Sequence, residues 1–247
     1  MRRSRVRFPQ AAPVVSPGAP GPTEKGHGVD NLESWSGSAK PQRLVLNGRY
    51  ARLEPLSVAQ HSEDLYGIAC GDGAENLYQY LLEPAPQTHT EFTEWAVRAE
   101  ASEDPLFFAV IDSATQRAGG RQALMRFDQA HGVVEVGHIL WGPAIARTRV
   151  ATEAFFLLAD YVFSTLGCRR LEWKCDSRNE PSQRAARRFG FVFEGVFRHH
   201  MVVKGHNRDT AWFSIIDDDW PLLRENFVSW LAPSNFDSDG IQKRSLR

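Results

Sequence analysis

The chain is poor in the features that mark several large classes of protein. Its 247 residues include three cysteines, Cys70, Cys168 and Cys175, and no CxxC pair, which disfavours both a zinc ribbon and a disulfide scaffold. No stretch approaches the roughly 18 consecutive apolar residues of a membrane-spanning helix. The net charge of −1, from 29 basic and 30 acidic residues, leaves no overall field for wrapping nucleic acid or coating an anionic membrane. We therefore expect no nucleic-acid or membrane partner, and a reducing, cytoplasmic environment.

Several signatures of catalysis and metal binding are also missing. The patterns GxSxG, GxxxxGKS/T and GxGxxG do not occur, so hydrolase, P-loop and Rossmann interpretations have no support. His199 and His200 are neighbours in an expected strand, where successive side chains point to opposite faces, so they cannot both reach one ion. Together with His206 they are interpreted as surface residues, and we expect no metal.

The composition changes along the chain. Residues 1–41 hold six of the fourteen prolines and show no apolar periodicity, which predicts a disordered extension. With 42% hydrophobic residues, the whole chain has enough apolar side chains for a sizeable core. We expect a single domain over residues 43–232 and a flexible tail over residues 233–247.

Hydrophobic periodicity outlines strands and helices that alternate in the second half of the chain. Asn47-Gly48 predicts a hairpin turn within residues 43–55. A helix begins after Asn179, whose side chain is a capping type, and ends at Gly190. The other expected elements are helices over 58–67, 88–102, 151–166 and 220–230, and strands over 106–111, 120–127, 133–141, 170–175, 193–203 and 210–216, with residues 204–209 joining the last two strands.

The junction Trp141–Glu153 (WGPAIARTRVATE) is the most informative segment for chemistry. A strand there leads through a loop into a helix, and the first N–H groups of a helix have no internal partner. With the helix dipole they attract anions such as a phosphate or pyrophosphate, and Arg147 and Arg149 add two positive charges. The alternative is a solvated loop in which both arginines pair with surface carboxylates.

Four segments of the second half of the chain carry a recognisable pattern: Val134–Trp141 (VEVGHILW), Ala146–Ala154 (ARTRVATEA), Leu166–Asp176 (LGCRRLEWKCD) and Asn179–Glu194 (NEPSQRAARRFGFVFE). Together they resemble one known family, the Gcn5-related N-acetyltransferases, and more closely its branch of ribosomal-protein serine and alanine N-acetyltransferases. The resemblance covers about residues 43–220.

The resemblance implies an α/β fold with a mixed, mostly antiparallel sheet flanked by helices. Strands 133–141 and 170–175 would run parallel and splay apart, and acetyl-CoA would lie in the opening between them. The implied acetyl-CoA contacts are Ile139, Leu140, Trp141, Arg147, Thr148, Arg149, Val150, Ala151, Thr152 and Asn179. In the family the pantetheine arm pairs with the main chain of the first strand, here Ile139 to Trp141.

The implied reaction is acetyl transfer from acetyl-CoA to a primary amine. The acceptor would be a protein N-terminus that begins with Ser or Ala, or a small molecule such as a polyamine or amino sugar. Main-chain N–H groups near Ile139 would polarise the thioester carbonyl. The alternative from a different class is a degenerate fold that binds CoA or a partner without catalysis.

Two departures from the family pattern bear on these expectations. The pyrophosphate loop of the family reads Arg/Gln-x-x-Gly-x-Gly/Ala, whereas here Ala146 occupies the basic position and Arg149 the first glycine position. Many relatives use a tyrosine to protonate the leaving thiolate, and the matching residue here is Ala186. The remaining acids are Ser182 and water, with Cys175 a poorer choice because its strand alternation predicts burial.

Glu135 is our expected general base. Strand alternation places it with Gly137 and Ile139 on one face, and Val134, Val136, His138 and Leu140 on the other. A carboxylate on an otherwise apolar strand is costly unless it is paired or functional. The equally weighted alternative is a salt bridge, for example to Arg126.

Two further expectations concern the last hairpin. Arg208-Asp209 either fixes the turn or lines the acceptor mouth. Residues 210–216 could form an edge strand that pairs between subunits, so a monomer and a homodimer are both compatible with the sequence.

Overall fold

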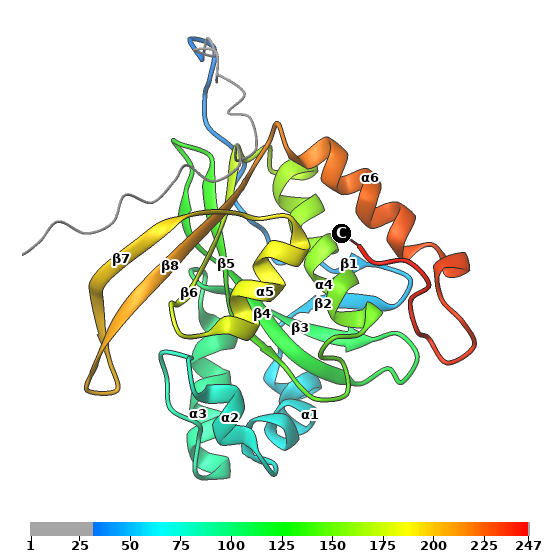
Figure 1. The fold of residues 1–247 in the computed structure, drawn as a ribbon. Coiled ribbons are helices and arrows are strands. Elements are labelled where there is room, and N and C mark those ends of the chain that lie inside the picture. Colours follow the sequence, from blue (N-terminus) through cyan, green and yellow to red (C-terminus); the bar gives the residue numbers. More distant parts are fainter. Residues whose placement is uncertain (1–31, 247) are drawn as a thin grey trace, which may run out of the picture. The chain divides into compact units, whose positions relative to one another are not determined.

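The computed structural model describes residues 32–246, and these form one eight-stranded mixed sheet with helices on both faces (Figure 1). The spatial strand order is β1-β2-β3-β4-β5-β6-β8-β7, in which only the β5–β6 pair is parallel. The strands are β1 (Leu46–Asn47), β2 (Ala51–Pro55), β3 (Leu106–Asp112), β4 (Ala118–Asp128), β5 (Val133–Trp141), β6 (Arg170–Asp176), β7 (Val192–Val203) and β8 (His206–Ile216). The expected fold class is confirmed.

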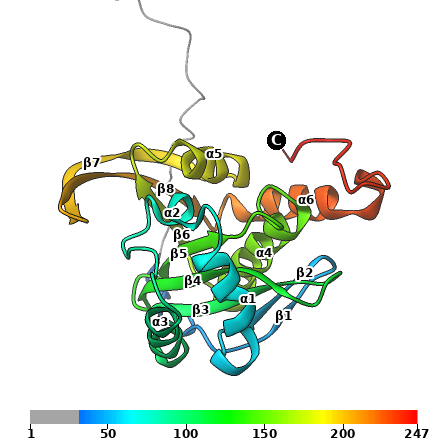
Figure 2. The ribbon, with the colours of Figure 1, turned by 90° about the horizontal axis from the view of Figure 1, so that it is seen from below.

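Three helices cover one face of the sheet: α1 (Val58–Cys70), α2 (Ala74–Tyr78) and α3 (His89–Ala101). They lie together at one end in Figure 1, and Figure 2 shows α1 and α3 beside strands β3 and β4. Thr88 starts α3 because its side chain accepts a hydrogen bond from the Glu91 N–H. Phe92 and Phe107 belong to the buried cluster that joins these helices to the sheet.

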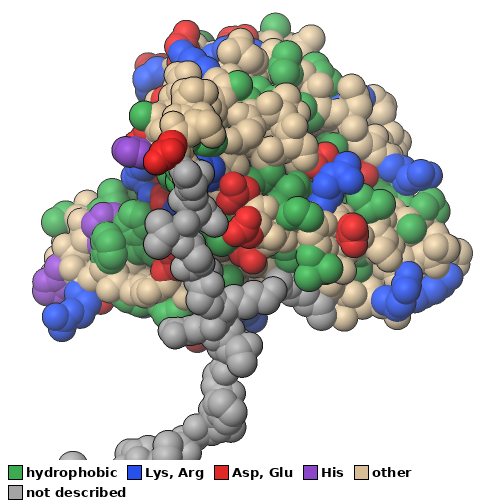
Figure 3. Space-filling view, turned by 90° about the horizontal axis from the view of Figure 1, so that it is seen from above, with side chains coloured by type: hydrophobic (Ala, Val, Ile, Leu, Met, Phe, Trp, Pro, Cys, Tyr) green, Lys and Arg blue, Asp and Glu red, His purple; other side chains and the backbone are tan. Residues whose placement is uncertain are grey.

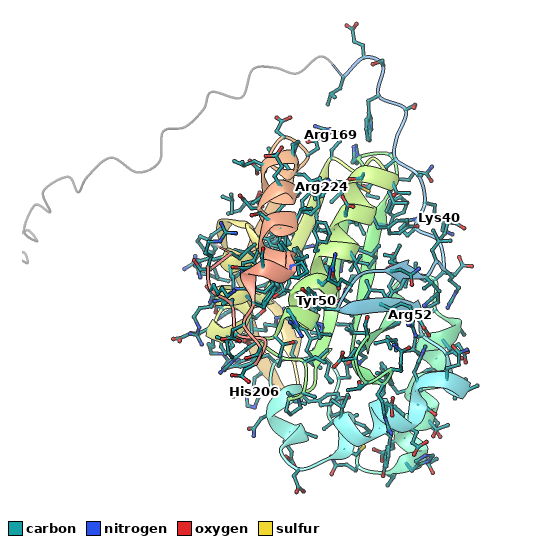
Figure 4. All side chains as sticks on the ribbon, turned by 90° about the vertical axis from the view of Figure 1, so that its right-hand side faces the viewer. Lys40, Tyr50, Arg52, Arg169, His206 and Arg224 are labelled. Carbon is teal, nitrogen blue, oxygen red and sulfur yellow. The ribbon has the colours of Figure 1, made fainter. Side chains whose placement is uncertain are left out.

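The opposite face carries α4 (Arg149–Asp160), α5 (Glu180–Phe189) and α6 (Trp220–Leu231). A short π-helix (Tyr161–Thr165) extends α4, and a 3-10 turn (Pro233–Asn235) follows α6. The rings of Phe155 in α4 and Phe189 in α5 stack with centroids 4.4 Å apart. Arg224 of α6 pairs with Asp160 of α4 at 2.8 Å, and Figure 4 shows Arg224 between these helices.

The parallel pair β5–β6 opens partway along its length. The two strands are in register only from Val133 opposite Arg170 to Glu135 opposite Glu172. Beyond Glu135 their main chains separate, as the resemblance implied. The main-chain groups of the second half of β5 on that side therefore have no strand partner within the described part of the chain.

A β-bulge at His138 makes part of the expected side-chain alternation of β5 wrong. His138 has φ 49°, and the register with β4 shifts between Arg121 and Ala123. Val134 and Val136 consequently lie in the core under α4 and α6, whereas Leu140 lies in the core under α1 and α3. After the bulge, each side chain of β5 therefore points to the face of the sheet opposite to the one that simple alternation predicts.

The last hairpin also differs from the expectation. Strand β8 begins at His206, so residues 204–209 are not a loop; the turn is Lys204-Gly205, with φ 49° and 78°. Strand β8 pairs with β6 on one side and β7 on the other, so it is not an edge. The edge strand at this end of the sheet is β7, and its exposed hydrophobic side chains include Val192, Phe193, Val196, Phe197 and Val202. Figure 3 shows hydrophobic surface at the end of the domain where β7 lies.

The structure describes part of the expected N-terminal extension and most of the expected C-terminal tail. Residues 1–31 of the expected 1–41 extension lie outside the described residues, but the Ser38 and Ala39 N–H groups donate to the main-chain oxygens of Gln129 and Leu166. At the other end, residues 233–246 pack on the domain, because Phe236 and Leu246 are only 7% and 8% exposed in the core.

Candidate active site

A large cleft of about 960 Å³ runs through the opening between β5 and β6. Its lining comes from both faces of the sheet: Glu135 and Lys174 from one face, Trp173 and Cys175 from the other. The remaining walls are the segment after α2, the N-terminal ends of α4 and α5, strand β8 and the C-terminal segment 236–242. All of the expected site residues line this cleft except Val150, whose side chain is buried in the core.

The N-terminus of α4 points its main-chain donors at the cleft. Thr148 caps the helix, because its hydroxyl accepts from the Val150 N–H at 3.1 Å. The N–H groups of Arg149 and Ala151 are left without an intrahelical acceptor. Arg149 is the first residue of the helix and is not in the left-handed region, so the missing glycine causes no strain at that position. The left-handed residue is Arg147, with φ 64°.

The side chain of Arg149 is held by aromatic rings. Its guanidinium lies 4.4 Å from the ring centre of Tyr50 and 5.3 Å from that of Phe236. Tyr50, labelled in Figure 4, follows the β1–β2 turn, and Phe236 belongs to the C-terminal segment. Arg149 thus joins three distant parts of the chain, while Arg147 remains exposed at the cleft.

Arg188 of α5 adds a partly buried cation beside the α4 N-terminus. Its Nη1 donates to the Thr152 hydroxyl at 3.1 Å, and its guanidinium lies 4.9 Å from the Trp230 ring centre. Burial lowers the pKa of Arg188, and the described residues offer it no carboxylate partner within 4 Å. A desolvated cation next to free helix N–H groups is a good environment for a phosphate.

The β5 bulge is anchored by a buried ion pair. Arg121, 2% exposed, donates to the His138 carbonyl at 2.9 Å and pairs with Glu83 at 2.7 Å. Burial alone would raise the pKa of Glu83, but His138 and Arg121 outweigh it and lower that pKa to about 2. The His138 Nδ1 lies 3.6 Å away, so Arg121 makes the shorter contact.

Glu135 is buried and already has two cationic partners. Its carboxylate lies 2.6 Å from Arg126 Nη1 and 3.1 Å from Lys174 Nζ. Lys174 also pairs with Glu172 at 2.7 Å and lies 3.9 Å from the Trp212 ring centre. The contact with Arg126 is the one that the sequence suggested as the structural alternative, and Glu135 still lines the cleft where an amine could reach it.

Ser182 lies at the start of α5 on the cleft wall. Its hydroxyl accepts a hydrogen bond from the Trp173 indole at 2.9 Å and also hydrogen-bonds the side chain of Cys175. Asn179 caps α5 by accepting from the Ser182 N–H at 3.1 Å, as the sequence predicted. Burial raises the pKa of the neighbouring Cys175 thiol, which is therefore protonated at neutral pH. Ala186 is fully buried.

Sequence reasoning missed several of the charged groups of the site. Arg188, Lys174 and the Arg121–Glu83 pair were not singled out. The sequence contained only a weak indication that Arg188 lines the site: helical spacing places it on the same face of α5 as Pro181 and Ala185. The other groups gave no local signal, because their partners lie on different elements.

Two negative findings apply to residues 32–246. They contain no group of three or more His, Cys, Asp or Glu side chains arranged to hold a metal ion. Within the same residues, no helix combines the length and apolar character that bilayer crossing requires.

Comparison with known proteins identifies the family. Residues 52–192 match the family described as Acetyltransferase (GNAT) domain. A GCN5-related N-acetyltransferase structure from Brucella melitensis is 54% identical, covers 87% of this chain and 97% of that one, and superposes with a TM-score of 0.86. A GNAT-family structure from Chromobacterium violaceum is 37% identical, with coverage of 85% and 100% and a TM-score of 0.72.

A curated relative gives the same result. The N-acetyltransferase p20 of Bacillus licheniformis is 30% identical over 117 residues, which are 46% of this chain and 63% of that protein. The match thus spans less than two thirds of that relative. The chain belongs to the GNAT family of N-acetyltransferases.

Proposed function

We propose that this protein transfers the acetyl group of acetyl-CoA to a primary amine held in the same cleft. The observation that carries the proposal is the end of β5–β6 pairing at Glu135, which opens a passage between the two faces of the sheet. A cleft of this kind admits two reactants from opposite sides. Holding both there removes much of the entropic cost of a bimolecular reaction.

The residues of the cleft fit acetyl-CoA. The unpaired main chain of β5 near Ile139 to Trp141 suits an extended chain with amide groups such as the pantetheine arm. The N–H groups of Arg149 and Ala151, with Arg188 beside them, suit its phosphates. Arg147 is an exposed cation at the same entrance.

Bound acetyl-CoA supplies an activated acetyl thioester. Glu135 accepts the proton that the acceptor ammonium must lose, directly or through water, and shifts its contact from one of its two cations as it does so. Main-chain N–H groups near Ile139 polarise the acetyl carbonyl. Ser182 or water returns a proton to the departing thiolate, because Ala186 cannot.

The acceptor is either a protein N-terminus beginning with Ser or Ala or a small amine. A second function, CoA binding without catalysis, is favoured by one observation only, the buried Ala186 in place of a tyrosine. Release of free thiol from acetyl-CoA, measured with a panel of amines and Ser- and Ala-initiated peptides, separates these options. Turnover with any acceptor excludes the binding-only function. If CoA stabilises the protein against heat but no amine or peptide of the panel is acetylated, the proposal of acetyl transfer is wrong.

A further inference from the structure

Arg208 is a buried cation that lines the cleft and has no anionic partner among the residues that the structure describes. It lies in β8 and is 8% exposed. Its Nε is fully buried and makes no hydrogen bond, and no carboxylate among the described residues lies within 4 Å of its guanidinium. Burial lowers the pKa of Arg208, although the charges of Asp176 and Glu135 oppose this effect. A buried guanidinium without an anion is costly, so its retention here calls for a partner from outside.

The position of Arg208 separates it from the expected phosphate site. Along β8 it alternates with Thr210 and Trp212, which lie opposite Asp176 and Lys174 in register. Trp212 contacts Lys174, and Lys174 pairs with Glu135, so this row faces the side of the sheet that carries Glu135. The N-termini of α4 and α5 are on the other side, next to Trp173 and Ser182.

The acids near Arg208 are already neutralised by other cations. Asp176 accepts from Arg178 at 3.0 and 2.8 Å through its two oxygens. Glu135 pairs with Arg126 and Lys174. Among residues 32–246, the positive charge of Arg208 therefore has no acidic side chain left to neutralise it in this part of the cleft.

This part of the cleft is also covered. The β7–β8 turn reaches α2, where Lys204 Nζ donates to the Tyr78 carbonyl at 2.7 Å. Tyr80 and Leu81 of the following segment line the cleft, as do His200 and Thr210, whose side chains are 3.0 Å apart. A charge-assisted hydrogen bond made here is less screened by solvent than one on an open surface.

We propose that the acceptor amine carries a carboxylate and that Arg208 binds this carboxylate while the amine lies at Glu135. The proposal rests on the proposed acetyl transfer and narrows its acceptor class. The guanidinium can donate hydrogen bonds to both carboxylate oxygens at once, which would orient the amine toward the acetyl group. A free amino acid and the acidic side chain of a peptide N-terminus share this chemistry.

The test compares acids with their neutral amides on the full-length protein. Thiol release from acetyl-CoA is measured for ω-amino acids with one to five methylenes, and for the carboxamide of each. Peptides that begin Ser-Asp or Ser-Glu are compared with Ser-Asn and Ser-Gln, which distinguishes a peptide source from a free amino acid. We expect at least one acid to exceed its amide by about 10–150-fold in kcat/KM, the equivalent of one charge-assisted contact.

The variant Arg208→Met should remove that preference, because it should raise KM for the acid much more than KM for the matched amide. Arg224→Met is the matched control, because this arginine is exposed, pairs with Asp160 far from Arg208 in the sequence and does not line the cleft; it should keep the preference. If no acid exceeds its amide in wild type, the proposal is wrong whatever the variants do. If the preference survives Arg208→Met, it is also wrong. The absence of thiol release from every amine would instead refute acetyl transfer itself.

Discussion

Arg188 provides the sharpest test of how the cofactor is bound. If its guanidinium contacts a CoA phosphate, the contact is a charge-assisted hydrogen bond worth about 1.5–3 kcal/mol. Arg188→Gln should therefore weaken acetyl-CoA binding by about 10–150-fold, since about 1.4 kcal/mol corresponds to a factor of ten. Because no carboxylate of the described residues lies within 4 Å of the Arg188 guanidinium, removal of this charge should leave the melting temperature of the protein unchanged or raise it.

The assay is isothermal titration calorimetry with CoA at two salt concentrations. Arg184→Gln is the matched control, because Arg184 lies on the same helix but is 65% exposed and already paired with Glu180. Its effect should stay within about twofold. Pantetheine, which lacks the phosphates, should bind wild type and Arg188→Gln equally. An unchanged CoA affinity in a folded Arg188→Gln variant would make Arg188 a packing residue on Trp230 and refute the assignment.

Four further outcomes follow from the contacts described above. Glu135→Gln should lower turnover by about 10²–10⁴-fold at neutral pH with little change in CoA affinity; near-normal turnover would make Glu135 purely structural. Glu153→Gln should lower the free energy of unfolding by at least about 1.5–3 kcal/mol, because the buried carboxylate accepts hydrogen bonds from three main-chain N–H groups of residues 49–51. Urea denaturation measures this loss, and an unchanged urea midpoint of unfolding would contradict it. Because the folded-state pKa of Glu83 is about 2, ionised Glu83 contributes about 3 kcal/mol to the free energy of unfolding above pH 5, and this contribution is lost as the pH falls toward 2. The difference in unfolding free energy between wild type and Glu83→Gln should therefore shrink to zero over that range. A difference that does not change with pH would refute the reasoning. Arg149→Gly should reduce thermal stability more than CoA affinity, since the side chain stacks on aromatic rings; a loss of affinity at unchanged melting temperature would show that it holds phosphate instead.

The elements that the sequence predicted well are those whose signals are local. The Asn179 cap and the terminal Gly190 bound α5 as expected, and β5 spans Val133–Trp141 as expected. Gly167 ends the helical segment after α4 in the left-handed conformation. Each of these depends on the intrinsic preference of one residue or on a period that repeats within a few residues.

The errors arose where distant residues compete with the local pattern. The bulge at His138 is held by Arg121 from β4 and by Glu83 from the segment after α2, so alternation along β5 alone could not reveal it. The two-residue turn Lys204-Gly205 replaced a six-residue loop because ladder pairing with β7 continues through His206. Both outcomes follow from hydrogen bonds between strands rather than from residue preference.

By itself, the sequence determined the family, the order of elements and the strand–loop–helix junction that would hold acetyl-CoA, because these follow from short patterns of residues. Only the tertiary structure decided which charges are paired. It showed Glu135 between two cations, Arg149 against Tyr50 and Phe236, and Arg208 with no anionic partner within residues 32–246. The physical reason is that an ion pair depends on distances of a few ångströms between elements far apart in the chain, and spacing along the sequence does not contain those distances.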